Sequence, residues 1–148
     1  MANKILWAAA PTSRGNVLST EMNALADNAF TASGTEVDNS TNLDTYGMLE
    51  FNVNATAAFA AGAYVAIYIL SAPDGTNYSE GSASVTPGAD TWLLNIPIRA
   101  TADAILKVTK VFPLPPTKIK FILENQAGLV FPTAGSTLEL FSMNYELQ

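Results

Sequence analysis

From Thr35 onward, polar and apolar residues alternate along much of the chain, and this alternation constrains the fold more than any other feature. In the stretch LEFNVN, Leu49, Phe51 and Val53 alternate with glutamate and asparagine. A period of two is typical of a β-strand with one buried face and one solvated face. The pattern therefore predicts a protein built from strands that cover an apolar core.

Other segments extend this prediction. The stretch YVAIYIL, Tyr64 to Leu70, is apolar on both faces and indicates a central strand. In TWLLNIPIRA, Pro97 cannot donate to a ladder hydrogen bond, so we expect an edge strand or a bulge there. After the proline-rich corner PLPP, apolar and charged residues alternate in KIKFILE. The closing stretch TLELFSMNYEL changes phase after Leu140, which predicts a bulge or a change of sheet.

The first third of the chain follows a different pattern. Residues 1–17 predict an extended arm, because Pro11 and Gly15 interrupt any long helix. A short helix is expected next, with Ser19 as its N-cap and Gly34 after its end. The apolar residues at helical spacing in this segment are Leu18, Met22, Leu25, Ala26 and Ala29.

Together these segments predict an all-β fold: a single-domain β-sandwich or jelly-roll-like structure with an extended N-terminal arm and one short N-terminal helix. We expect the arm at residues 1–17 and one domain at residues 18–148. A chain of 148 residues suffices for this, because a domain of this size buries roughly 68–70% of its unfolded surface.

Charge and composition exclude several partners. Charged residues make up 14% of the chain, against about 25% in a typical soluble domain. The formal net charge is −6 and the seven Lys and Arg residues form no cluster, so we expect no binding to nucleic acid. The same acidity disfavours anionic membrane surfaces, and no apolar stretch reaches the length of a membrane-spanning helix.

The chain contains neither His nor Cys, which removes the commonest general base, the commonest metal ligand and the thiol nucleophile. Carboxylates remain, but Glu50, Glu124 and Glu139 occupy the polar phase of predicted strands, where solvated glutamates are the ordinary expectation. We therefore predict no catalytic residues and no cofactor. The acidic stretch from Glu36 to Asp44 has the oxygen donors of a Ca²⁺ loop, but we favour a turn capped by its own side chains and predict no metal site.

The aromatic residues allow a sugar-binding platform as an alternative. Trp92 shares a phase with Leu94 and Ile96, which favours the core. The turn APDGTNYSEG is polar, so Asp74, Asn77 and Tyr78 are the candidates for a surface contact with a ligand.

Several stretches, in this order, resemble a family of small virion structural proteins of tailed bacteriophages: LSTEMNALADNAF, GTEVDNSTNLDTYGMLEFNV, YILSAPDGTNYSEG, FPLPPTKIKFILENQAG and AGSTLELFSMNYEL. The similarity runs from about Leu18 to Tyr145, and its most specific parts are DNSTNLD, PDGTNY and LPPTKIKFILENQAG. The resemblance implies a non-enzymatic capsid cement or decoration protein on the outer surface of the virion, with a β-sandwich or jelly-roll-like fold.

That resemblance implies further expectations. The major capsid protein would be the partner, with Ile5, Leu6 and Trp7 of the arm as the partner-binding residues. A closed homo-oligomer, for example a trimer, is the expected assembly. Two alternatives stay open: a tail-fibre, baseplate or other receptor- or glycan-binding virion module that uses Asp74 to Tyr78, and a carbohydrate-active enzyme with two buried acids.

Overall fold

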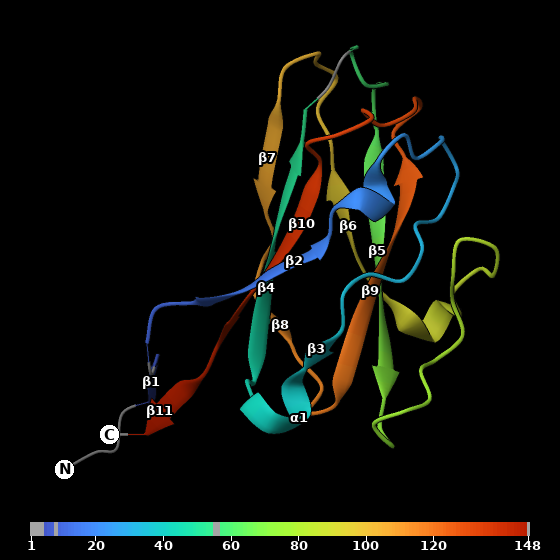
Figure 1. Cartoon of the computed structure of the whole chain (residues 1–148). Coiled ribbons are helices and arrows are strands. Elements are labelled where there is room, and N and C mark those ends of the chain that lie inside the picture. The colour runs from blue at the N-terminus through green and yellow to red at the C-terminus, as the bar shows by residue number, and fades with distance from the viewer. Residues whose placement is uncertain (1–4, 8, 55–56, 148) are drawn as a thin grey trace.

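The computed structural model describes residues 5–7, 9–54 and 57–147. Two antiparallel sheets face each other across one apolar core, and a small two-stranded ribbon projects from the body (Figure 1). The predicted all-β sandwich is confirmed.

The first sheet has the strand order β2–β10–β4–β7. These strands are β2 (Thr12–Leu18), β10 (Thr137–Met143), β4 (Tyr46–Val53) and β7 (Ile105–Val108). The short strand β8 (Phe112–Pro113) follows β7 along the same edge of β4. The closing stretch changes sheet after β10, as one of the two predicted alternatives requires, because β11 (Tyr145–Leu147) pairs outside the first sheet. The predicted bulge is absent from β10, which pairs with β4 in unbroken register; the extra residues at the shifts between β10 and β2 lie in β2.

The second sheet has the order β3–β9–β5–β6. Its strands are β3 (Val37–Asp38), β9 (Lys118–Gln126), β5 (Tyr64–Ala72) and β6 (Trp92–Pro97). As predicted, β5 is an internal strand, and Pro97 ends an edge strand. The minor elements are the 3₁₀ turns Thr20–Met22 and Ala89–Thr91 and the one-turn helix α1 (Asn39–Asn42).

The core lies between the inward faces of these two sheets. Along β4, buried and half-buried residues alternate strictly, which is the pattern expected from its sequence. The alternation in β9 likewise buries Ile119, Phe121 and Leu123 while its two lysines stay half-exposed. Each fully buried Leu, Ile or Phe side chain contributes about 1.5–3 kcal/mol relative to an exposed one, so these two strands anchor the sandwich.

The prediction of a helix after Ser19 is wrong. Only a single 3₁₀ turn forms, and Ser19 makes no side-chain capping hydrogen bond. The rest of the segment is irregular, with positive φ at Ala24 and Asn28. Its backbone is paired with distant strands instead: Asn28 N–H donates to Asn125 O and Thr31 N–H to Leu123 O. A segment this short is marginal as an isolated helix, so these tertiary bonds decide its conformation.

The prediction that Trp92 is buried in the core is also wrong, because this residue is 51% exposed. A register shift separates Leu94, which pairs with Ile67, from Trp92, which pairs with Tyr68. The extra residue in β6 reverses the side-chain phase, so Trp92 shares the outer face of the sheet with Tyr68.

Candidate functional site

The predicted partner-binding residues Ile5, Leu6 and Trp7 form strand β1 (Ile5–Trp7). This strand pairs antiparallel with β11 (Tyr145–Leu147), so that Ile5 lies opposite Leu147. Figure 1 shows the two strands as a ribbon that extends away from the sandwich and carries both ends of the chain. The side chains of residues 5–7 lie outside what the structure describes. The end of the expected arm, from Thr12 to Val17, is not free but belongs to β2 in the first sheet.

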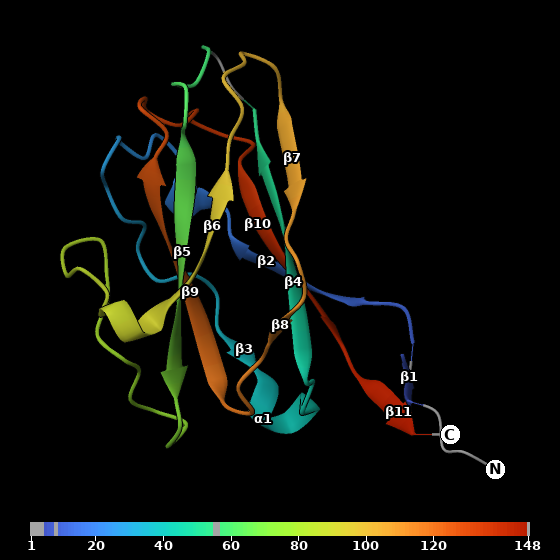
Figure 2. The same cartoon turned by 180° about the vertical axis from the view of Figure 1, so that it is seen from behind.

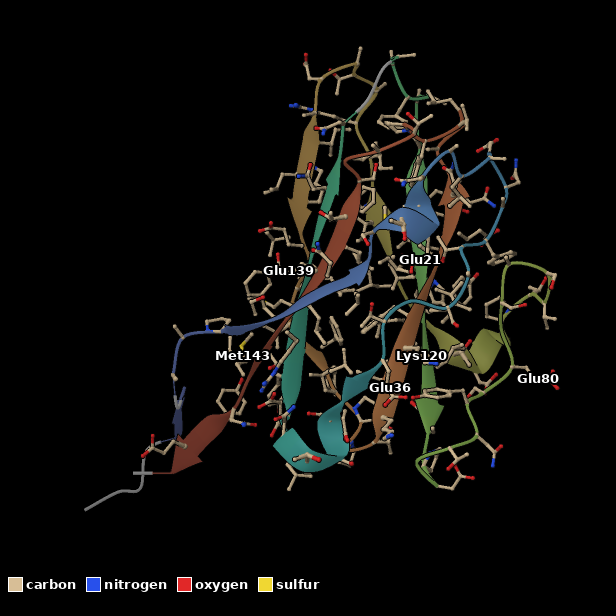
Figure 3. All side chains as sticks on the ribbon, viewed as in Figure 1. Glu21, Glu36, Glu80, Lys120, Glu139 and Met143 are labelled. Atoms are coloured by element: carbon tan, nitrogen blue, oxygen red, sulfur yellow. The ribbon has the colours of Figure 1, made fainter. Side chains whose placement is uncertain are left out.

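An apolar hollow of about 570 Å³ lies where the ribbon joins the sandwich. Figure 3 labels Met143 at this junction, near the end of β10. The wall combines the bend before β2 with side chains of β4, of β10 and of the segment before β8. Its lining residues are Ala9, Ala10, Pro11, Met48, Val111 and Met143. Methionine side chains adapt their shape to what they contact, so this hollow suits an apolar side chain of a partner.

A polar cluster around Asp44 holds the root of the ribbon. The carboxylate of Asp44 is nearly buried and forms an ion pair with Arg14 of β2. It also accepts hydrogen bonds from Ser142 Oγ at 2.6 Å and Asn144 Nδ2 at 3.0 Å. Asn144 Oδ1 in turn accepts from Thr45 N–H at 2.8 Å. Because Asn144 is the residue between β10 and β11, this network fixes the direction in which the ribbon leaves the body.

Tyr145, the first residue of β11, also ties the ribbon to the sandwich. Its ring meets that of Tyr46 edge to face, with the ring centroids 4.8 Å apart. Edge-to-face aromatic pairs add about 0.5–1.5 kcal/mol beyond the area that they bury. The ribbon is therefore held at its base and extends from it.

The predicted surface contact at the turn after β5 is largely engaged within the protein. Asp74 accepts from the N–H groups of Thr76 and Asn77 and from Asn77 Nδ2. These bonds lower the pKa of Asp74 to about 2, and the bond from the backbone N–H of Asn77 has the largest effect. The carboxylate caps its own turn, which leaves a ligand fewer free lone pairs.

Tyr78, the third of the candidate contact residues, lies apart from Asp74 and contacts the second sheet. Its hydroxyl donates to Glu36, which lowers the pKa of Glu36, and burial raises the pKa of Tyr78 to about 12. Lys120 Nζ lies 4.5 Å from the ring centroid, and Lys118 Nζ lies 3.1 Å from Glu36 Oε1. Figure 3 shows Glu36 and Lys120 in the same region. One face of the ring is thus covered by a cation of the chain itself.

The acidic stretch from Glu36 to Asp44 forms a capped turn. Asp38 accepts from Ser40 N–H at 3.0 Å and caps α1, and the hydrogen bond from the Ser40 hydroxyl lowers the pKa of Asp38. Buried Asn39 bonds to Asp44 O and Pro115 O. Across residues 5–7, 9–54 and 57–147, no group of three potential metal-ligating acids is found.

The three strand carboxylates lie on outward faces. Glu124 accepts from the Tyr68 hydroxyl at 3.0 Å and from Gln126 Nε2 at 2.7 Å. Glu50 and Glu139 are direct cross-strand partners on β4 and β10, and Glu139 also accepts from the Ser13 hydroxyl. The register brings these two carboxylates together, which the separate strand patterns could not reveal.

Sequence reasoning missed the apolar hollow at the root of the ribbon. Met48 lies in the polar phase of its strand, and Val111 lies in a segment with irregular alternation. An apolar residue out of phase in an otherwise alternating strand was the available signal.

Comparison with protein-family models, with curated protein sequences and with solved structures finds no match to this chain. Among the described residues, no helix has the length and apolar character needed to cross a bilayer.

Proposed function

We propose that this chain is a non-enzymatic virion structural protein of a tailed bacteriophage, a capsid cement or decoration protein. It binds the major capsid protein on the outer surface of the head and stabilises the shell. The proposal starts from the resemblance of residues 18–145 to small phage virion proteins, and the β-sandwich fold agrees with what that resemblance implies.

The observation that carries the proposal is the projecting ribbon with an apolar hollow at its root. Two strands of three residues are marginally stable in water without further packing. The described contacts between the ribbon and the sandwich lie at its base, so the ribbon gains stability when its outer surface is covered by another protein. Such an extension beside an apolar hollow is suited to grip a neighbouring subunit.

The mechanism is binding by many copies. A protein that binds the assembled shell and not its separated subunits stabilises the shell by mass action. Contacts with neighbouring capsomers add avidity without any new chemistry. A closed homo-oligomer, such as a trimer, multiplies the contacts further.

Co-sedimentation with purified expanded capsids of the source phage tests the proposal, with the melting temperature of the shell measured in parallel. We expect saturable binding and a higher shell melting temperature. Deletion of residues 2–10, which removes β1, should lower shell binding while the melting temperature of the sandwich stays close to that of the intact protein.

The matched control is Asp74→Asn, which alters the polar turn after β5 and leaves the ribbon intact. It should bind shells like the unmodified chain. Loss of shell binding in this variant alone would place the shell contact at the turn and not at the ribbon. Failure of the intact protein to bind mature shells would refute the cement role and favour the receptor-binding alternative.

A further inference from the structure

The sandwich has two flanks, where an edge strand of one sheet faces an edge strand of the other. One flank is covered by the chain itself and the other is open. At one flank the chain covers itself with the segment 19–36. Met22 and Leu25 of this segment enter the core. Its backbone bonds along β9, with Gly34 N–H donating to Phe121 O at 3.0 Å and Asn125 N–H to Ala29 O at 2.9 Å. An extended segment that adds to a sheet edge thus closes this flank.

At the other flank, β6 and β7 run along the side of the molecule seen in Figure 2. A groove of about 410 Å³ lies between them. No segment of the described chain covers it in the way that residues 19–36 cover the first flank. The groove is lined by Leu94, Asn95, Ile96, Pro97, Lys107, Val108, Thr109 and Lys110.

The outer edge of β7 has backbone groups available for a further strand. Thr109 N–H donates to Leu49 O at 2.9 Å, so Thr109 belongs to a hydrogen-bonded position of the β4–β7 pair. Hydrogen bonding alternates along an antiparallel pair, which directs the N–H and C=O groups of Leu106 and Val108 to the open edge. Their side chains are 58% and 55% exposed. An incoming strand would find both donors and apolar contacts here.

Cations that lack an ion pair within the described chain gather at this flank. Lys107 and Lys110 line the groove, and Arg99 lies in the connection between β6 and β7. None of these three forms a salt bridge with any described residue. The described cations elsewhere have internal partners: Arg14 with Asp44, Lys118 with Glu36, and Lys120 with the ring of Tyr78.

This charge distribution indicates which kind of partner segment the groove between β6 and β7 can bind. Lys107 lies opposite Phe51 in the register, so its stem follows the inner face of the edge strand. A charge placed there opposes pairing with the same edge of another copy, because two such lysines would meet. Carboxylates are attracted instead, on a protein whose overall charge of −6 otherwise repels them.

We propose that the β6–β7 groove binds an extended acidic segment of a partner protein. The segment adds as a strand to the open edge of β7, sets carboxylates in the groove beside Lys107 and Lys110, and places apolar side chains on the outer face against Leu106 and Val108. It is the intermolecular counterpart of what residues 19–36 do at the first flank. The inference rests on the proposed function for the partner's identity, which would be a segment of the capsid protein.

Synthetic peptides test the groove without any shell. A fluorescent peptide of alternating Glu and Val, about eight residues long to match a strand, is titrated with the full chain and followed by anisotropy. A Lys/Val peptide of the same length is the control ligand. The Glu/Val peptide should bind saturably, and the Lys/Val peptide should not. Equal binding of both peptides, or binding of neither, overturns the proposal.

Variants then locate the binding. Lys107→Gln with Lys110→Gln should weaken Glu/Val binding about tenfold, since an ion pair with half-buried Lys107 or with exposed Lys110 contributes a few-fold. Lys120→Gln removes one positive charge from the second sheet and is the matched control. The single variants Lys107→Gln and Lys110→Gln are measured beside it. If Lys120→Gln weakens binding as much as either of them, the attraction is general and the groove is not the site.

A backbone variant tests strand addition itself. Val108→Pro removes an N–H that faces the open edge, and proline is tolerated on edge strands at such positions. The melting temperature should change little while peptide binding falls several-fold. Unchanged binding would rule out pairing with β7.

The same variants separate this inference from the proposed function. If the double lysine variant keeps full shell binding, the groove is not used on the capsid and the cement role stands. If the protein binds the peptide but does not bind intact shells, the groove is a binding site and the capsid role is refuted.

Discussion

Replacement of Asn125, on β9, should lower the free energy of unfolding strongly for the few atoms removed. This residue is fully buried. Its Nδ2 donates to Leu25 O at 3.0 Å, Ala26 O at 3.2 Å and Leu129 O at 2.9 Å, and its Oδ1 accepts from Ala127 N–H at 3.0 Å. One side chain thus joins the covering segment, β9 and the connection that follows β9.

Asn125→Ala should lower the free energy of unfolding by about 3–4 kcal/mol. Each hydrogen bond contributes about 0.5–1.5 kcal/mol net, and a buried group left without a partner costs about 1–3 kcal/mol. Water entering the space of the lost amide offsets part of this. At about 2–4 °C per kcal/mol for a domain of this size, the melting temperature should fall by about 10 °C.

Asn125→Asp keeps the shape but replaces the donating amide with an acceptor that faces three carbonyl oxygens. At neutral pH the loss should be at least as large as for Asn125→Ala. Burial raises the folded-state pKa of the introduced carboxyl above its unfolded value, so the penalty should shrink as the pH falls and grow as it rises.

Urea and thermal unfolding followed by circular dichroism measure both variants. Asn52→Ala, on the half-exposed outer face of β4, is the matched control and should cost under about 0.5 kcal/mol. A loss below about 1 kcal/mol for Asn125→Ala would refute the assignment of these hydrogen bonds as the clamp of the covering segment.

Three further predictions concern local contacts. Gly34→Ala should destabilise the protein by about 1–3 kcal/mol in urea unfolding, because a Cβ there would collide with the carbonyl oxygen of β2 behind it. Gly47→Ala meets only a leucine side chain and should cost less, and the reverse order would contradict this reading of the packing. Glu50→Gln should raise stability by about 0.2–1 kcal/mol, since Glu50 lies directly opposite Glu139; unchanged stability at low salt would indicate that the two carboxylates avoid each other. Asp74 has its pKa lowered from 3.8 to about 2, so its contribution is present above the unfolded pKa and is lost as the pH falls through the folded one. The melting temperature should decline over that acidic range, and Asp74→Asn should flatten the decline.

The strands were predictable because their side chains follow a local rule. β4 and β9 bury every second residue, and the alternation of Leu49, Phe51 and Val53 is visible without any knowledge of their neighbours. The failures arose where tertiary contacts overrode local preference. The segment after Ser19 satisfies its backbone on β9, and one extra residue in β6 turned Trp92 outward.

The candidate binding surfaces were less predictable than the strands. The tip residues Ile5 to Trp7 are expected to bind the partner because of what the resemblance implies, and the structure adds that their backbone pairs with β11. The hollow and the groove depend on which strands become neighbours. Lys107 becomes a groove residue only because β7 is an edge strand beside β6, and no periodicity in the chain encodes that neighbourhood.

The position of β10 in its sheet has a consequence for how the molecule is made. This strand alone joins β2 to β4, yet it leaves the ribosome after every other strand of the two sheets. Until it emerges, β2 has no partner in the sheet, and Val17 and Leu18 stay in contact with water. Pairings between strands so far apart in sequence form slowly, because the intervening chain must first be ordered. We therefore expect nascent chains that stop before Thr137 to be protease-sensitive and to depend on chaperones, and the first sheet to form only after β10 has emerged.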